Sequence, residues 1–248
     1  MVESGLVLHD VDKNSFTIPS PVLELLVPQL SGRRSRRFIR LATRALDAVL
    51  PSSDPTNWSV LEEFVAAADH CISNVASSQD TSRELIIILV DLLEYFEVRG
   101  QHARTRELCR RAISISEYEL PDQQELSFYL LMAIASALSH LKSYDEAEHQ
   151  IQRARSLVQE SNDRENVIGR APCVIMLASV RRDRGRFQEA ASLFEEVIRA
   201  FGPYENEDSE FVAEVLEEYA GFLTSLGERA RESEVRLKAS AIRARHSS

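Results

Sequence analysis

The chain has 248 residues, and its hydrophobic content of 44% is sufficient for a packed core. The formal net charge of −10 argues against general nucleic-acid binding, because that activity needs a basic surface to neutralise phosphates. Eight glycines and eight prolines are too few for a turn-rich all-β protein or a disordered chain. Composition therefore favours a folded protein that is not all-β, either one large unit or an elongated array.

The sequence predicts no targeting signal and no membrane span. The N-terminal segment lacks a basic region followed by an apolar stretch, and the longest apolar run, Leu85 to Val90, is far shorter than a span. The cysteines Cys71, Cys109 and Cys173 form no CxxC pair and fit buried thiols in a reducing compartment. These features predict a cytoplasmic protein that does not bind membranes.

The first 80 residues are expected to form two small units. Residues 6 to 18 read as two short strands around a turn, and a helix from Pro21 to Leu30 completes a unit over 1–30. Helices over 36–50 and 58–75, separated by a proline-containing break, predict a degenerate capping helix pair over 31–80. An arginine cluster in this region fits a solvated helix face better than a docking patch for an acidic partner.

A repeating turn signal dominates the rest of the chain. It falls at Gly100, Lys142, Gly185 and Gly227, with spacings of 42, 43 and 42 residues. A fixed period of this kind is typical of a solenoid, in which each unit contacts its neighbours. Residues 81–248 are therefore predicted to form four antiparallel helix hairpins, at about 86–119, 128–161, 171–204 and 213–246.

Small residues recur at equivalent places around these turns, where two helices must approach closely. The first helix of three units carries one such place, and the second helix carries two more. The members are Ala135, Ala178 and Ala220; then Ala147 and Ala190; and then Ala112, Ala154 and Ala239. An aromatic residue follows the turn in two units, at Tyr144 and Phe187. This pattern resembles the tetratricopeptide repeat, and the long period is similar to that of the kinesin-light-chain type.

The resemblance implies an all-α, right-handed superhelical solenoid whose first helices line a concave groove. Residues 1–80 resemble the winged-helix end and bridge that precede the repeats in STAND-type signalling ATPases. The chain has no GxxxxGK phosphate loop, so nucleotide hydrolysis by this chain alone is not expected. It also lacks GxSxG, HExxH and GxGxxG motifs, and its single Glu-x-x-His step, at Glu146 and His149, fits the polar face of a solvated helix better than a metal site. We therefore expect no catalysis, cofactor or metal.

Four residues are predicted to form the centre of a partner site in the groove: Tyr129, Met132, His140 and Arg182. Tyrosine and arginine are frequent hot-spot residues, and methionine suits adaptable surfaces. The alternative is that Tyr129 and Met132 belong to the core between repeats. The expected function is a non-catalytic adaptor or sensor scaffold for a protein or peptide partner, in a signalling or defence complex. Two alternatives remain: a regulator that senses a short signalling peptide or small ligand, and a homo-oligomeric scaffold.

Overall fold

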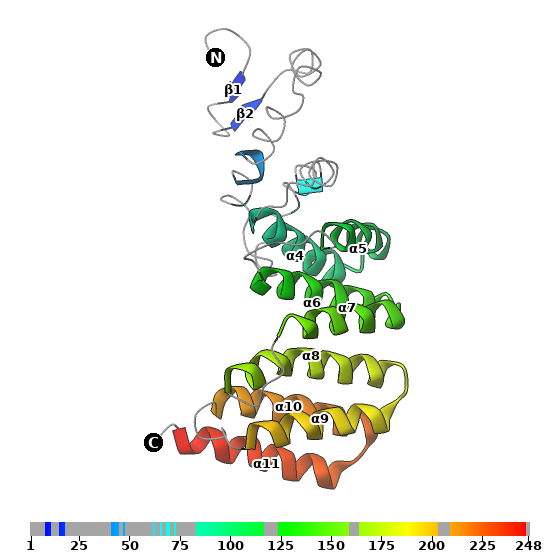
Figure 1. Cartoon of the computed structure of the whole chain (residues 1–248), viewed down its shortest axis with the longest axis vertical. Helices are drawn as coiled ribbons and strands as arrows, with labels where there is room; N and C mark the ends of the chain where they lie inside the picture. The colour runs from blue at the N-terminus through cyan, green and yellow to red at the C-terminus, as the bar shows by residue number, and fades with distance from the viewer. Residues whose placement is uncertain are drawn as a thin grey trace.

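The computed structural model describes residues 8–10, 15–17, 41–44, 83–116, 124–158, 164–202 and 209–246, together with a few further positions between 47 and 72. In these ranges two short strands are followed by helices stacked in antiparallel pairs (Figure 1). The helices are α4 (Arg83–Val98), α5 (His102–Ser116), α6 (Gln124–His140), α7 (Tyr144–Ser156), α8 (Arg164–Asp183), α9 (Phe187–Phe201), α10 (Ser209–Leu226) and α11 (Arg229–His246). The predicted solenoid of helix hairpins is confirmed. Each first helix begins three to seven residues before the start expected from the sequence.

The predicted N-terminal hairpin is also present. Strands β1 (Leu8–Asp10) and β2 (Ser15–Thr17) pair antiparallel, with Leu8 opposite Thr17 and Asp10 opposite Ser15. The helix expected over 21–30 lies outside the described residues, as does most of the helix pair expected over 31–80.

The turn within each helix pair has the same geometry. Gly100, Lys142, Gly185 and Gly227 all have positive φ, at 64°, 59°, 78° and 75°. At the first turn, the Gly100 N–H donates to the Glu97 carbonyl and the Gln101 N–H donates to the Phe96 carbonyl, at 3.0 and 2.9 Å, and the other three turns repeat both bonds. This is the Schellman arrangement, which satisfies the last carbonyls of a helix and selects glycine for its left-handed backbone. The repeat period of the sequence is therefore the period of this turn.

The recurring alanines lie where the helices meet. Every alanine of the predicted pattern has no exposed surface: Ala112, Ala135, Ala147, Ala154, Ala178, Ala190, Ala220 and Ala239. Large apolar side chains fill the space between them, such as Leu92, Ile134 and Phe222 at 0–1% exposure. Small residues thus set how closely each pair can approach, and large residues supply the buried apolar area.

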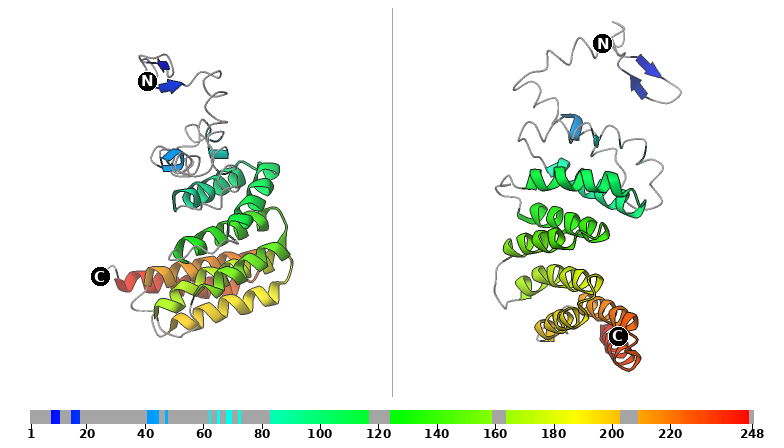
Figure 2. Two further views of the ribbon diagram at one scale, coloured as in Figure 1. Left: turned by 45° about the horizontal axis from the view of Figure 1, so that its top comes forward. Right: turned by 90° about the vertical axis from the view of Figure 1, so that its right-hand side faces the viewer.

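The pairs stack along the long axis of the molecule (Figures 1 and 2), and α8 connects the two halves of the stack. The cluster of buried residues from α4 to α7 includes Cys173 and Val180 of α8. A second cluster includes Val167 and Val174 of α8, and a third includes Ala178. We call the contact between α7 and α8, which joins the second and third pairs, the α7–α8 seam.

Two cysteines are confirmed as core thiols. Cys109 and Cys173 are buried and not oxidised. Burial raises the pKa of the Cys109 thiol to about 12 and that of Cys173 to about 11. At neutral pH neither thiol is the thiolate that nucleophilic or redox chemistry requires. Cys71 lies outside the residues whose side chains are described.

Candidate functional site

A hollow of about 330 Å³ lies between the first helices of three successive pairs. Its walls come from α6, α8 and α10 and from the residues that end α7. They are largely apolar: Gln124, Glu125, Phe128, Tyr129, Leu157, Val158, Ile168, Gly169, Pro172 and Phe211. A volume of this size accommodates a bulky side chain, since a cavity of roughly 150 Å³ holds benzene.

Two residues of α8 shape this hollow. Pro172 stands inside α8, where it has no N–H to donate to the carbonyl of Ile168 one turn before it. That carbonyl therefore loses its helical donor beside the hollow. At Gly169, a Cβ atom would lie 3.2 Å from Cγ1 of Val158, so the absence of a side chain lets the end of the α7 segment approach α8 closely.

Tyr129 and Met132 occupy different environments. Tyr129 lines the hollow, is 54% exposed, and makes an edge contact with Phe128 at a ring-centroid distance of 6.0 Å. Met132 is half-buried against the N-terminal core cluster, and its Sδ lies 3.8 Å from Sγ of Cys173. Tyr129 is thus available to a partner, whereas Met132 contributes mainly to packing between α6 and α8.

His140 ends α6 and contacts the preceding pair. Its Nδ1 lies 2.9 Å from Oε1 of Glu97 in α4 and 3.0 Å from the carbonyl of Ser136. The Ser136 hydroxyl donates to the same Glu97 carboxylate at 3.3 Å. Burial raises the pKa of Glu97, and the neighbouring Glu94 adds to this rise, while His140 and Ser136 oppose it. These contacts join the ends of α4 and α6 on one face.

Arg182 lies near the end of α8. Its Nε donates to Oδ1 of Asp183 at 2.8 Å. Its charge also lowers the pKa of Glu218 in α10, against larger effects of burial and Glu214 that leave that pKa raised. Among the carboxylates of α10, Arg182 therefore affects Glu218, although only weakly.

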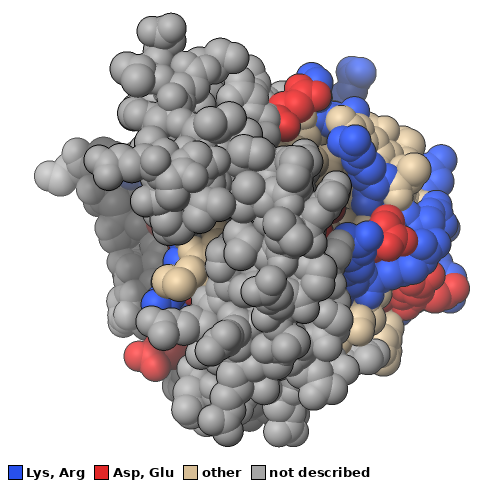
Figure 3. Space-filling model, turned by 90° about the horizontal axis from the view of Figure 1, so that it is seen from above, with Lys and Arg blue, Asp and Glu red and all other residues tan. Residues whose placement is uncertain are grey.

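The first and second helices of the first pair differ in charge. Burial, followed by repulsion from Glu94 and Asp47, raises the pKa of Asp91 in α4 to about 6. The second helix, α5, instead exposes Arg104, Arg106 and Arg110. In the view from above, Lys and Arg side chains gather on the side of the molecule where α5 lies (Figure 3). A partner approaching α4, the first helix of this pair, would meet negative charge.

The four residues predicted from the sequence are spread along the helices. Tyr129 and His140 are eleven residues apart in α6, which corresponds to about 16 Å along the axis. The structure joins His140 to α4, pairs Arg182 with Asp183 of its own helix, and places Tyr129 at the hollow. The other walls of the hollow, notably Ile168 and Phe211, were not predicted from the sequence. Their only local signal was an apolar position in a helical period, which core residues share.

Residues 126–202, from α6 to α9, match the family model of the tetratricopeptide repeat. The match supports a tetratricopeptide repeat protein, and such repeats generally mediate protein–protein interactions. No curated protein matches the chain. Among the described residues, no helix is long and apolar enough to cross a membrane, and no group of three His, Cys, Asp or Glu side chains could hold a metal ion.

Proposed function

We propose that this protein is a non-catalytic scaffold that holds a protein or peptide partner along its first helices. The observation that carries the proposal is the apolar hollow, because it combines an exposed aromatic side chain with walls from three successive pairs. A partner side chain seated there would contact α6, α8 and α10 at once. Tyr129 provides the anchor contact, and His140 and Arg182 contribute polar contacts toward the other ends of their helices.

The N-terminal unit and the resemblance to STAND-type ATPases suggest the setting. In this proposal residues 1–30 are a winged-helix-like remnant and residues 31–80 cap the array, with residues 81–248 forming the binding region. The chain would then act in the cytoplasm within a signalling or defence complex. The kinesin-light-chain-like period supports the same class, since long repeats give long helices and a broad binding face.

Affinity capture of the tagged chain from its own cell lysate, read by mass spectrometry, tests this function. The variant Tyr129→Ala/Arg182→Ala removes contacts from the proposed face. The matched control is Phe187→Ala, which removes an exposed aromatic side chain from a second helix, α9. We expect a stoichiometric partner to be lost with the double variant and kept with the control.

The reverse pattern would place the interface on the second helices. If the tagged chain recovers only untagged copies of itself, a self-associating scaffold replaces the adaptor. A mass that rises with concentration, measured by light scattering, would identify that case. Circular dichroism of each variant checks that the helices remain folded.

A further inference from the structure

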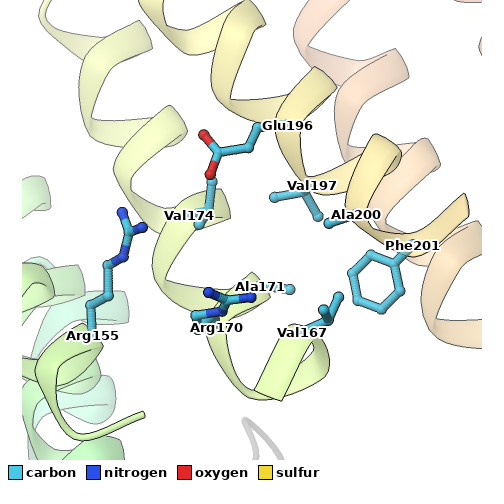
Figure 4. A pocket seen from close by; sticks show the side chains of 9 residues that line it. All are labelled: Arg155, Val167, Arg170, Ala171, Val174, Glu196, Val197, Ala200 and Phe201. Atoms are coloured by element: carbon cyan, nitrogen blue, oxygen red, sulfur yellow. The ribbon is translucent and has the colours of Figure 1, made fainter. Parts of the chain in front are cut away.

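A second hollow, of about 210 Å³, lies beside the α7–α8 seam and is lined by other residues than the first (Figure 4). Its floor is apolar, and most of it is deeply buried: Val167, Ala171, Val174, Val197, Ala200 and Phe201. Three charged side chains from three helices surround this floor, namely Arg155 of α7, Arg170 of α8 and Glu196 of α9. The hollow therefore offers two guanidinium groups, one carboxylate and an apolar surface to a single small ligand.

The two arginines differ in their contacts. Arg170 is held within the protein, and one of its contacts is the hydrogen bond from its Nε to the Asn166 carbonyl at 3.2 Å. Arg155 is half-buried, and no carboxylate of the described residues forms an ion pair with it. A guanidinium that is partly withdrawn from water is costly unless an anion accompanies it. An anion that enters the hollow would provide that compensation.

Arginines at the opposite end of the same seam already have such partners. The Arg181 Nη2 lies 2.8 Å from Oε2 of Glu148, and the Arg184 Nη1 lies 3.0 Å from Oε1 of the same carboxylate. Arg184 also bonds to Asp145 at 2.7 Å. The carboxylate that lines the hollow, Glu196, is exposed and belongs to α9 instead. It suits a cationic group of the ligand as well as it suits either arginine.

We propose that this hollow binds a free aliphatic amino acid such as leucine. Its carboxylate would accept hydrogen bonds from Arg155 and Arg170, its ammonium group would face Glu196, and its side chain would rest on the apolar floor. The volume exceeds the roughly 150 Å³ cavity that holds benzene, so a branched aliphatic chain fits. Because α7 and α8 belong to different pairs, the bound ligand would stabilise the seam. This role is separate from partner binding along the first helices.

Isothermal titration of the full chain with L-leucine, L-leucinamide and 3-methylbutanoate tests each contact. We expect leucine to bind and to raise the melting temperature, since a ligand of the folded state stabilises it. Leucinamide lacks the carboxylate and should not bind. The acid 3-methylbutanoate lacks the ammonium group and should bind more weakly than leucine. Equal binding of leucinamide, or no binding of leucine at millimolar concentration, would overturn the proposal.

Two variants and one control assign the site. Arg155→Gln should weaken leucine binding at least tenfold, as expected for the loss of a hydrogen bond to a charged group. Glu196→Gln should weaken leucine binding and leave binding of 3-methylbutanoate unchanged. Because Glu196 is exposed, this substitution should not affect folding. The control Arg110→Gln removes the same charge from the exposed face of α5.

Equal affinity of Arg155→Gln and the wild type for leucine would contradict the assignment. If a peptide that ends in leucine binds and free leucine does not, the ligand is the C-terminus of a peptide chain and the proposal of a free amino acid is wrong. Inorganic phosphate that binds as tightly as leucine would reduce the site to a general anion site. Loss of partner capture with Tyr129→Ala has no bearing on these outcomes, so the two proposals fail separately.

Discussion

The two ends of the α7–α8 seam provide opposite environments for arginine. At the end nearest the hairpin turns, Arg181 and Glu148 are only 18% and 13% exposed and bond to each other at 2.8 Å. At the other end, Arg155 lines an open hollow without a carboxylate partner among the described residues. At the paired end, removing one partner would destabilise the fold, because it would leave the other charge withdrawn from water. The open end leaves its charge available to a ligand.

The largest expected effect comes from breaking the paired end with Glu148→Ala. Arg181 and Arg184 would both lose a carboxylate in a mostly buried site, so we expect the free energy of unfolding to fall by about 2 kcal/mol. Arg155→Ala at the open end should change it by less than about 0.5 kcal/mol. Urea denaturation followed by circular dichroism measures both. A comparable loss in Glu107→Ala, which removes an exposed carboxylate from α5, would show that burial is not the cause.

The comparison can be sharpened with a carboxylate that faces other carboxylates, Asp91. Its pKa of about 6 lies above the ordinary value of 3.8, so ionisation favours the unfolded chain. The stability present below about pH 4 is therefore lost as the pH rises through about 6. Asp91→Asn should stabilise the protein by about 1–2 kcal/mol at pH 7 and change little at pH 4. The urea midpoints of wild type and Asp91→Asn at the two pH values measure this gain, and Asp183→Asn is the control. An equal gain in stability at pH 4 and pH 7 would show that ionisation of Asp91 is not its cause.

The turns that border the paired end allow a test in the stabilising direction. Lys142 has a φ of 59°, a left-handed conformation that costs a non-glycine residue roughly 1–2 kcal/mol. Lys142→Gly should therefore raise stability by about 1 kcal/mol, and Gly185→Ala should lower it by a similar amount. Thermal and urea unfolding measure both changes. Gly202→Ala serves as control, because Gly202 has a helical φ of −46° and should lose nothing.

The smallest expected effect concerns Cys173 of α8, whose thiol should not react with a labelling reagent while the protein is folded. Cys173 is buried and its thiol pKa is raised to about 11. In a Cys71→Ser background, an aromatic disulfide reagent should label neither Cys173 nor Cys109 while the protein is folded. Labelling of Cys173 alone, at a urea concentration that leaves Cys109 protected, would show that the seam opens before the first two pairs unfold. Fast labelling without urea would contradict the packing described.

The sequence allowed the array to be predicted because the turn geometry is local. A left-handed residue after a helix selects glycine strongly, so three of the four turns are visible directly. Lys142 was identified only because the period required a turn there. The buried alanines could also be predicted, because close helix approach excludes larger side chains.

The candidate sites could be predicted only in part. Tyr129 was found because aromatic residues are frequent at interfaces, and it does line the hollow. Ile168 and Phe211 could not be separated from core positions, because the hollow arises where three helices far apart in sequence fail to close. Arg155 could not be predicted as a site residue for the same reason, because the hollow that it lines is formed mainly by α8 and α9 and not by its own helix.

Helix α8 contributes to all three buried clusters of the described residues, and this has a mechanical consequence. Its residues Cys173, Val174 and Ala178 each belong to a different cluster, so α8 cannot extend without disrupting each of these three clusters. The outer pairs each depend on fewer neighbours. Tension applied to the two ends of the array would therefore unravel it from the outside inward, with α8 the last helix to yield.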